Sequence, residues 1–192
     1  MAGSPHFQSA PVQAVYARQG AGEAWRAVVR CSDLAGAMAQ VWGSFAVAVG
    51  DASGRVVLAV DRFASESLCY RVSDGHLTFA QRADDLADGH TPVDPQALFD
   101  YLYFHVIPSP RTIFKGVHRL PPAHYAWFEN GQLTVAPYWV PTFVEPTGAA
   151  FEPLAAEFRQ LLQDAVAAQL DGSKPACFLS GGTDSSTVAG MI

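Results

Sequence analysis

Three pairs of β-rich runs, each pair joined by a short turn-forming sequence, constrain the fold of this chain more than any other feature. A connection this short can join only antiparallel strands, because parallel strands need a crossover of a dozen or more residues. In the third pair the turn is Asn130-Gly131, a dipeptide that tolerates the positive φ values of a tight hairpin. The sequence therefore predicts an antiparallel sheet, with hairpins formed by runs 45–49 and 56–60, by runs 68–72 and 76–81, and within residues 124–139.

Two stretches with apolar residues at helical spacing place helices beside this sheet. The first covers residues 24–43, where Gly43 is a candidate helix stop. The second begins at Asp94, a good N-cap residue that is followed by proline, and its "DYLYF" segment (100–104) has the spacing of a helix that faces a core. Helices and antiparallel hairpins together predict an α+β fold.

Composition and charge exclude several classes of partner. The chain has a net charge of −6, and its 12 lysines and arginines are widely spread, so we expect no binding to nucleic acid. No segment reaches the roughly 18 unbroken apolar residues that a membrane span needs, and no secretory leader pattern is visible. Three distant cysteines fit a reducing compartment. We therefore expect a cytoplasmic protein that does not bind membranes.

A different kind of structure is predicted after residue 150, where a helical stripe (151–170) precedes an apolar run, "ACFLS" (176–180), and a polar loop. A buried strand, a tight loop and a helix in this order open an α/β domain. The loop reads Ser-Gly-Gly-Thr-Asp-Ser-Ser (180–186), and its glycines let a ligand approach the backbone closely. The start of the next helix adds unpaired N–H groups, which favour an anion.

This loop lacks the lysine of the GxxxxGK[ST] nucleotide-binding loop, so phosphate would be held by amides, hydroxyls and a magnesium ion. Asp184 is the candidate that would help to hold Mg²⁺ through the phosphate. A serine-rich helix cap without a ligand is the alternative interpretation of the same residues.

The order "SGGTDSS" resembles the SGG-x-DS pyrophosphate loop of the N-type ATP pyrophosphatases, and most closely that of the asparagine synthetase family. Segments upstream are similar to the glutaminase domain of the same family, so that the resemblance covers roughly residues 40–192. They read "GSFAVAVGD" (43–51), "LAVDRFASESLCYRV" (58–72), "LTFAQRADDL" (77–86) and "PSPRTIFKGVHRLPPAHYAWFENGQLTVAPYW" (108–139).

The resemblance implies two domains. Residues 1–140 would form an incomplete or degenerate glutaminase-like domain, an antiparallel Ntn-hydrolase-like sheet sandwich with helices. Residues 141–150 would be a linker. Residues 151–192 would be the N-terminal fragment of the synthetase domain, namely the first βα unit of an α/β ATP-pyrophosphatase domain.

The resemblance also implies an ATP-dependent amide ligase that activates a small, aspartate-like carboxylate as its adenylate and then transfers nitrogen to it. ATP and Mg²⁺ would be the cofactors. A homo-oligomer is expected for a separate reason, because the apolar faces of the helix 151–170 and of the strand 176–179 have no parallel neighbours in this chain. The residues implied to bind ATP and pyrophosphate are Ser180, Gly181, Gly182, Thr183, Asp184, Ser185 and Ser186.

One departure from the family leaves alternatives open. Members that hydrolyse glutamine begin Met-Cys-Gly, whereas this chain begins Met1-Ala2-Gly3, so no catalytic residue is assigned and the turn at Asp61-Arg62 is interpreted as structural. This departure fits relatives of the β-lactam synthetase type, which have lost the glutaminase cysteine. We expect an incomplete piece of a ligase that is inactive alone. The alternative is a non-catalytic, truncated or vestigial binding module.

Overall fold

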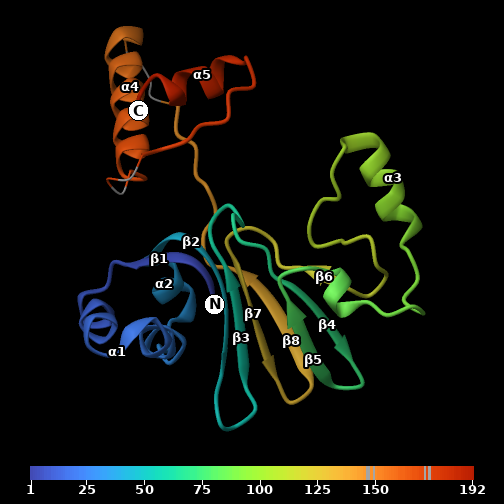
Figure 1. The fold of residues 1–192 in the computed structure, drawn as a ribbon. Coiled ribbons are helices and arrows are strands. Elements are labelled where there is room, and N and C mark those ends of the chain that lie inside the picture. Colours follow the sequence, from blue (N-terminus) through green and yellow to red (C-terminus); the bar gives the residue numbers. More distant parts are fainter. Residues whose placement is uncertain (146–147, 149, 171, 173) are drawn as a thin grey trace. The chain divides into compact units, whose positions relative to one another are not determined.

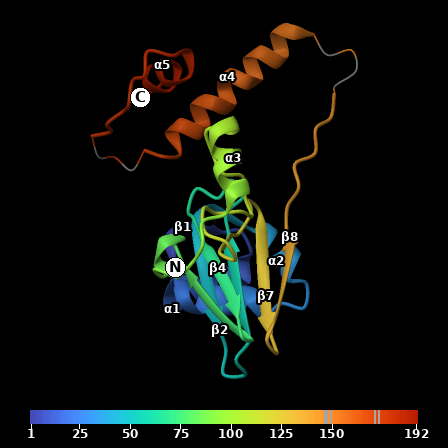
Figure 2. The same ribbon diagram turned by 90° about the vertical axis from the view of Figure 1, so that its right-hand side faces the viewer.

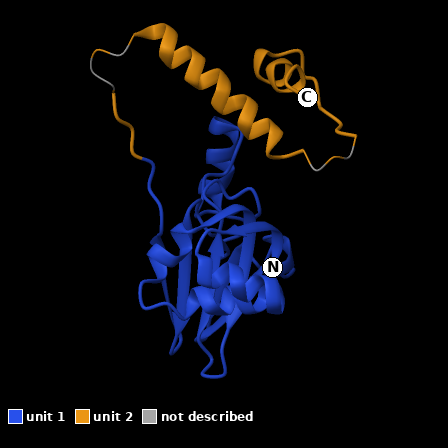
Figure 3. Cartoon of the chain, turned by 90° about the vertical axis from the view of Figure 1, so that its left-hand side faces the viewer, with its two compact units in different colours: residues 1–141 blue, residues 142–192 orange. Residues whose placement is uncertain are grey.

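The computed structural model describes residues 1–145, 148, 150–170, 172 and 174–192, and these divide into two compact units, 1–141 and 142–192 (Figure 3). Each unit is described by itself. None of the described helices combines the length and apolar character that crossing a bilayer requires.

Unit 1 is built on a five-stranded antiparallel sheet with the order β1-β2-β3-β7-β8. The predicted hairpin at Asn130-Gly131 is confirmed, because both residues have positive φ (52° and 77°) and Glu129 pairs with Gln132 across the turn. The strands are β1 (Ala2–Phe7), β2 (Val41–Gly50), β3 (Val56–Val60), β7 (His124–Glu129) and β8 (Gln132–Pro137).

A three-stranded antiparallel sheet, β5-β4-β6, covers one face of the larger sheet (Figure 1). It contains the second predicted hairpin, which turns at Asp74-Gly75. Its strands are β4 (Cys69–Ser73), β5 (His76–Ala80) and β6 (His118–Arg119). The predicted antiparallel α+β fold of this unit is therefore confirmed.

Alternation along the central strands explains the layers. Leu58 and Val60 of β3 pack with Leu68 and Leu120 in a cluster between the two sheets. Val57 and Ala59, which alternate with them along β3, lie on the opposite face with the helices. There α1 (Ala10–Val29) and α2 (Leu34–Ala39) cover the large sheet, as Figure 1 shows.

The N-terminal third differs from the sequence prediction. The helical region begins at Ala10 rather than near residue 24, and Gly43 lies within β2 instead of ending a helix. Gly43 has φ +83°, and a Cβ there would lie only 2.4 Å from the Ser4 carbonyl oxygen. The lack of a side chain at Gly43 therefore lets β1 and β2 approach each other closely. The helical spacing of the residues before it gives no indication of this contact.

Helix α3 (Pro95–Phe104) begins as predicted, because the Asp94 side chain accepts a hydrogen bond of 2.9 Å from the Gln96 N–H. The prediction that "DYLYF" faces a core was wrong. Asp100 is the buried residue of this segment, whereas Leu102 is 77 % and Tyr103 70 % exposed. The helix projects away from both sheets (Figures 1 and 2). Its apolar residues have helical spacing, but neither sheet covers the face that they form.

Unit 2 contains α4 (Phe151–Ala167) and α5 (Thr183–Ala189). The helix predicted over 151–170 is thus present. Residues 176–180 are not a buried strand in the structure, and Phe178 is fully exposed, because no neighbouring strand in this described unit pairs with them. The predicted linker, 141–150, includes residues 146, 147 and 149, which lie outside the described residues. The assignment of unit 2 to a synthetase domain stays a prediction.

Candidate functional site

The candidate site in unit 2 is the segment 180–186, whose seven predicted residues are contiguous. Ser180, Gly181 and Gly182 precede α5, whereas Thr183, Asp184, Ser185 and Ser186 form its first turn. Two serine hydroxyls meet across the loop, with 3.0 Å between the Oγ atoms of Ser180 and Ser185. The Ser180 N–H also donates to the Ser185 Oγ at 3.3 Å, and the Ser185 hydroxyl donates to the Gly182 carbonyl at 3.2 Å. These bonds close the loop around Gly181.

The two glycines of the loop have different functions in its geometry. Gly181 has φ +81°, the left-handed region that glycine adopts without strain, and nothing lies within 4 Å of the position of a Cβ. Gly182 has φ −83° and is the N-cap residue of α5. Its N–H donates to the Ser180 Oγ at 3.4 Å. An unhindered, exposed backbone at Gly181 gives a ligand room to approach.

Asp184 lies exposed in the first turn of α5. Among the residues that the structure describes, no group of three or more histidine, cysteine or acidic side chains could hold a metal ion, so Asp184 belongs to no such group. The donors of the loop are hydroxyls and amides, which suit phosphate oxygens. These residues fit Mg²⁺ only if phosphate oxygens supply most of its ligands.

In unit 1, the first residues of β1 carry no nucleophile. Ala2 pairs with Ala46 of β2 and packs against the cluster between the sheets. Beside it, the Met1 sulfur accepts a hydrogen bond of 3.0 Å from the Trp25 indole N–H. The three thiols of the chain, all free, lie elsewhere in the sequence, at Cys31, Cys69 and Cys177.

Asp61 is buried and organises the turn after β3. Its carboxylate accepts four backbone hydrogen bonds of 3.0–3.2 Å, from the N–H groups of Phe45, Phe63, Ser65 and Glu66. Burial raises the pKa of this carboxyl, but the four hydrogen bonds outweigh burial and hold the pKa below its ordinary value. A carboxylate with all its lone pairs occupied by backbone is a structural group, as the sequence interpretation had it.

Arg62 also acts structurally. Its guanidinium lies 3.9 Å from the ring centroid of Trp42 and 5.2 Å from that of Trp139. One guanidinium nitrogen, Nη2, donates to the Ala39 carbonyl at 3.0 Å. The arginine thus holds together the end of α2, strand β2 and the segment after β8.

A polar cluster that sequence reasoning missed attaches α3 to the loop that follows it. The buried Asp100 carboxylate accepts from Gln96 at 2.7 Å and from Arg111 at 2.8 Å. Arg111 also lies 3.3 Å from a carboxylate oxygen of Asp94. The spacing of Gln96 and Asp100, four positions apart on α3, could have predicted their hydrogen bond. The sequence could not predict Arg111 as the third member, because it lies outside the helix. Because its partners occupy this carboxylate, the cluster is structural.

Comparison with known proteins identifies two regions of the chain. The profile of the glutamine amidotransferase domain family matches residues 28–139, and the profile of the asparagine synthase family matches residues 157–192. The second match includes the whole loop 180–186.

Individual relatives agree with these matches. Amidase chyE of Penicillium rubens is 34 % identical over 157 residues, which cover 78 % of this chain and 23 % of that protein. Asparagine synthetase (glutamine-hydrolyzing) 3 of Bacillus subtilis is 32 % identical over 155 residues, which cover 78 % of this chain and 25 % of that protein. The chain thus spans about a quarter of the length of these curated relatives.

Proposed function

This chain belongs to the glutamine amidotransferase domain family, with a C-terminal match to asparagine synthase, and from that premise we propose that it is part of an asparagine synthetase-like, ATP-dependent amide ligase. The observation that carries the proposal is the loop 180–186. It has the residue order of a pyrophosphate loop, and it lies inside the region that the asparagine synthase profile matches.

In the proposed ligase the loop residues hold the pyrophosphate that leaves ATP. Ser180, Ser185 and the backbone around Gly181 provide hydroxyl and amide donors. Donors held in place before the reaction stabilise the charge that develops on the leaving group. Mg²⁺, when bound, neutralises phosphate charge, and Asp184 contributes one carboxylate to its surroundings. We further propose a small, aspartate-like carboxylate as the acceptor of nitrogen.

Unit 1, in this proposal, does not hydrolyse glutamine. Glutaminases of this type use an N-terminal cysteine, whose thiol and free α-amine act together. Strand β1 (Ala2–Phe7) contains no cysteine, and the match to the glutamine amidotransferase family begins at residue 28. Nitrogen would then come from ammonia or from an amine of the substrate. Incubation with glutamine should release no glutamate, and glutamate release at the rate of ammonia-dependent turnover would overturn this part.

The direct test is pyrophosphate release from ATP, Mg²⁺ and aspartate by the protein expressed from its complete reading frame. We expect Asp184→Ala to lower the rate by at least about 100-fold, the effect typical of losing one electrostatic contact to a transition state. Asp164→Ala is the matched control, because Asp164 is an exposed acid on α4 of the same unit. Normal turnover in the Asp184→Ala protein would defeat the assignment of the loop.

A non-catalytic binding module is the competing proposal. The observation that favours it is that Asp184, among the residues that the structure describes, belongs to no group of three metal-binding side chains. It predicts no pyrophosphate release with any carboxylate, in the presence or absence of ammonia. Release that depends on a carboxylate substrate would exclude it.

Cellular location and assembly complete the proposal. We propose a cytoplasmic protein, since the three free cysteines form no disulfide. We also propose a homo-oligomer, because α4 exposes large apolar side chains that a second copy would cover.

A further inference from the structure

Helix α3 carries an apolar face that the rest of unit 1 leaves uncovered. Four side chains form this face, and each of them is between 47 % and 77 % exposed: Leu98, Phe99, Leu102 and Tyr103. These four residues are called the α3 face below. Figure 2 shows α3 standing clear of the sheets, so that a second helix has room to reach the face.

The opposite side of α3 is fixed to unit 1. Ala97 and Asp100 are the buried residues of the helix. The Asp100 carboxylate accepts hydrogen bonds of 2.7 Å from Gln96 and 2.8 Å from Arg111, which lies in the loop after the helix. With 3.6 residues per turn, this buried pair lies on the other side of the helix from the α3 face. An anchored helix, rather than a loose segment, therefore presents the face to solvent.

The α3 face has the relief on which helix packing depends. Leu98 and Leu102 form one row of side chains four positions apart, and Phe99 and Tyr103 form a second row beside it. The rings of the second row stack, with 6.1 Å between their centroids and 11° between their planes. Rows of this kind are ridges that fit the groove between the same ridges of another helix, at a crossing angle of about −50°.

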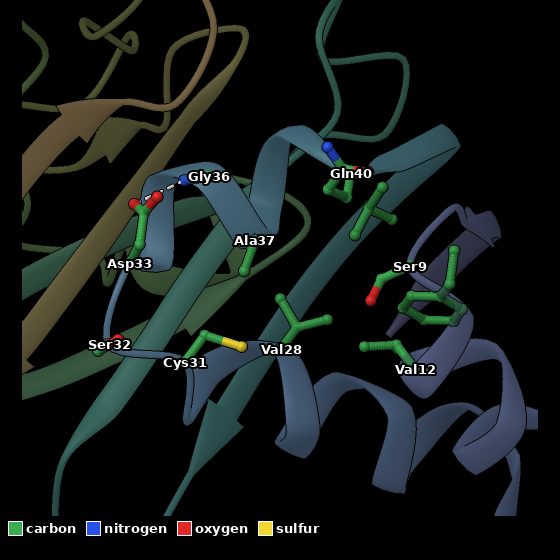
Figure 4. Close-up of a pocket in the computed structure, with 11 residues that line it drawn as sticks. Ser9, Val12, Val28, Cys31, Ser32, Asp33, Gly36, Ala37 and Gln40 are labelled. Carbon is green, nitrogen blue, oxygen red and sulfur yellow. Dashed lines mark hydrogen bonds between the residues drawn. The ribbon is translucent and has the colours of Figure 1, made fainter.

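A cavity of about 310 Å³ between α1 and α2 also exposes apolar side chains, among them Val12 and Val28 (Figure 4). The Asp33 carboxylate at its edge is turned toward the Gly36 N–H, from which it accepts a hydrogen bond of 2.9 Å. The cavity therefore directs no charge at a ligand, and it is too small for one turn of a helix with its side chains. The extended surface that unit 1 offers to a partner is the α3 face.

Charge and area favour a second copy of this chain as that partner. The α3 face and the flanking Tyr101 and Val106, each 54 % exposed, carry no charged group. Two copies, each with a net charge of −6, therefore meet here without opposing like charges, and the face offers no charge that would select a different protein. These side chains expose about 600 Å² per copy, so that a pair would bury about 1,200 Å², the lower limit for stable specific interfaces.

From these observations we propose that α3 is a dimerisation helix, and that the α3 faces of two copies pack against each other about a twofold axis. The contact is isologous, so each copy provides both the ridges and the groove that receives the ridges of its partner. It uses residues of unit 1 alone, and it is separate from the loop 180–186 and from the exposed apolar residues of α4.

Light scattering coupled to size exclusion tests the contact in a Phe158→Glu chain, where the added charge removes the apolar stripe of α4 as a second contact. We expect this chain to be a dimer at about 100 μM, with a dissociation constant on the order of 10 μM. Leu102→Glu places a charge in the α3 face of both copies and should give a monomer. Phe63→Glu is the matched control, because Phe63 is 78 % exposed in the turn after β3, and it should leave the dimer intact.

Chemical cross-linking locates the contact. In a chain with Cys31→Ser and Cys177→Ser, the buried Cys69 is the remaining native thiol. A short bismaleimide should then join two copies through Leu102→Cys, since a twofold axis brings the same residue of both faces together. The joined product should decrease on dilution from about 100 μM to about 1 μM, which spans the expected dissociation constant. Phe63→Cys, outside the face, should give little product at either concentration.

Three results would overturn the proposal. Equal masses for the Leu102→Glu and Phe63→Glu proteins would mean that the α3 face is not a contact between copies. A Leu102→Cys thiol that reacts rapidly with a single maleimide, but gives no joined product, would mean that the face stays uncovered. A thiol that reacts slowly in a monomeric chain would assign the face to another part of the same polypeptide. Since the substituted side chains are exposed, circular dichroism should show an unchanged fold. No measurement here involves ATP, so failure would leave the proposed function unaffected.

Discussion

At the scale of single residues, Asp61 provides the clearest test of how the turn after β3 is held. Asp61→Asn keeps the shape of the side chain, but its NH₂ group faces two of the four N–H donors that the carboxylate now satisfies. Leaving buried donors without an acceptor should lower the free energy of unfolding by about 3 kcal/mol. Urea denaturation measures this loss. The exposed Asp74→Asn control should change stability by less than about 0.5 kcal/mol, and a similar small loss for Asp61→Asn would contradict the role.

The same pair of proteins predicts a pH dependence. The pKa of Asp61 is lowered in the folded state, so its contribution to stability is complete above the ordinary carboxyl pKa of about 3.9 and is lost as pH falls through the folded value. The stability difference between the parent and the Asp61→Asn protein should therefore stay constant from about pH 7 to 5 and shrink below about pH 4. Subtracting the two curves cancels the other acids, which both proteins share. A difference that does not change down to about pH 2 would contradict the prediction.

The sequence predicted part of this residue-scale picture. The Asp-Arg pair indicated a turn, but the four donors to Asp61 come from two separate segments, and only the folded sheet brings Phe45 to it. Ala64 occupies a left-handed φ of 50° in that turn, where the resembling segment of the family has glycine. Asp184 and its neighbouring loop residues were predicted from residue order, whereas the contact between Ser180 and Ser185 required the structure.

At the scale of elements, turn chemistry was the most reliable guide. Asn130-Gly131 and Asp74-Gly75 predicted their hairpins because positive φ is a local property of those residues. Strand β1 escaped prediction, since Gly3 and Pro5 disfavour a strand locally and its pairing with β2 is a long-range interaction. The exposed side chains of α3 were misjudged for a related reason. Spacing identifies an apolar face, but not whether anything covers it.

The pairing of β1 with β2 leads to a prediction about two glycines with the same backbone angle. Substitution by alanine at Gly43 (φ +83°) or Gly54 (φ +86°) should lower the free energy of unfolding by about 1 kcal/mol through backbone strain alone, because alanine is strained in this region. Gly43→Ala should cost at least about twice as much, since its Cβ would lie 2.4 Å from the Ser4 carbonyl oxygen, whereas Gly54 has open space. Amide hydrogen exchange should show lost protection in β1 for Gly43→Ala alone. Equal losses of stability would contradict the close approach.

At the scale of the whole molecule, the family resemblance predicted more of the structure than periodicity and turn residues did. Periodicity and turns predicted an antiparallel α+β unit, and the amidotransferase match over residues 28–139 agrees with it. Residues 176–180 show where local signals were insufficient. Their apolar run was predicted to form a buried strand, but a strand needs neighbours, and within the described unit 2 none pairs with them. The exposed apolar side chains of that unit raise the question of what covers them.

Helix α4 provides the test of that question. Phe151, Phe158 and Leu161 are each at least 60 % exposed, and such contiguous apolar surface favours association between copies. We predict that the chain forms oligomers at tens of micromolar, and that Phe158→Glu shifts it toward monomer by placing a charge in the apolar stripe. Gln163→Glu adds the same charge at an exposed polar position of α4 and should leave the mass unchanged. Light scattering coupled to size exclusion measures both. A monomeric parent chain at about 100 μM, well above the affinity that a stripe of this kind should give, would mean that α4 is not a contact between copies.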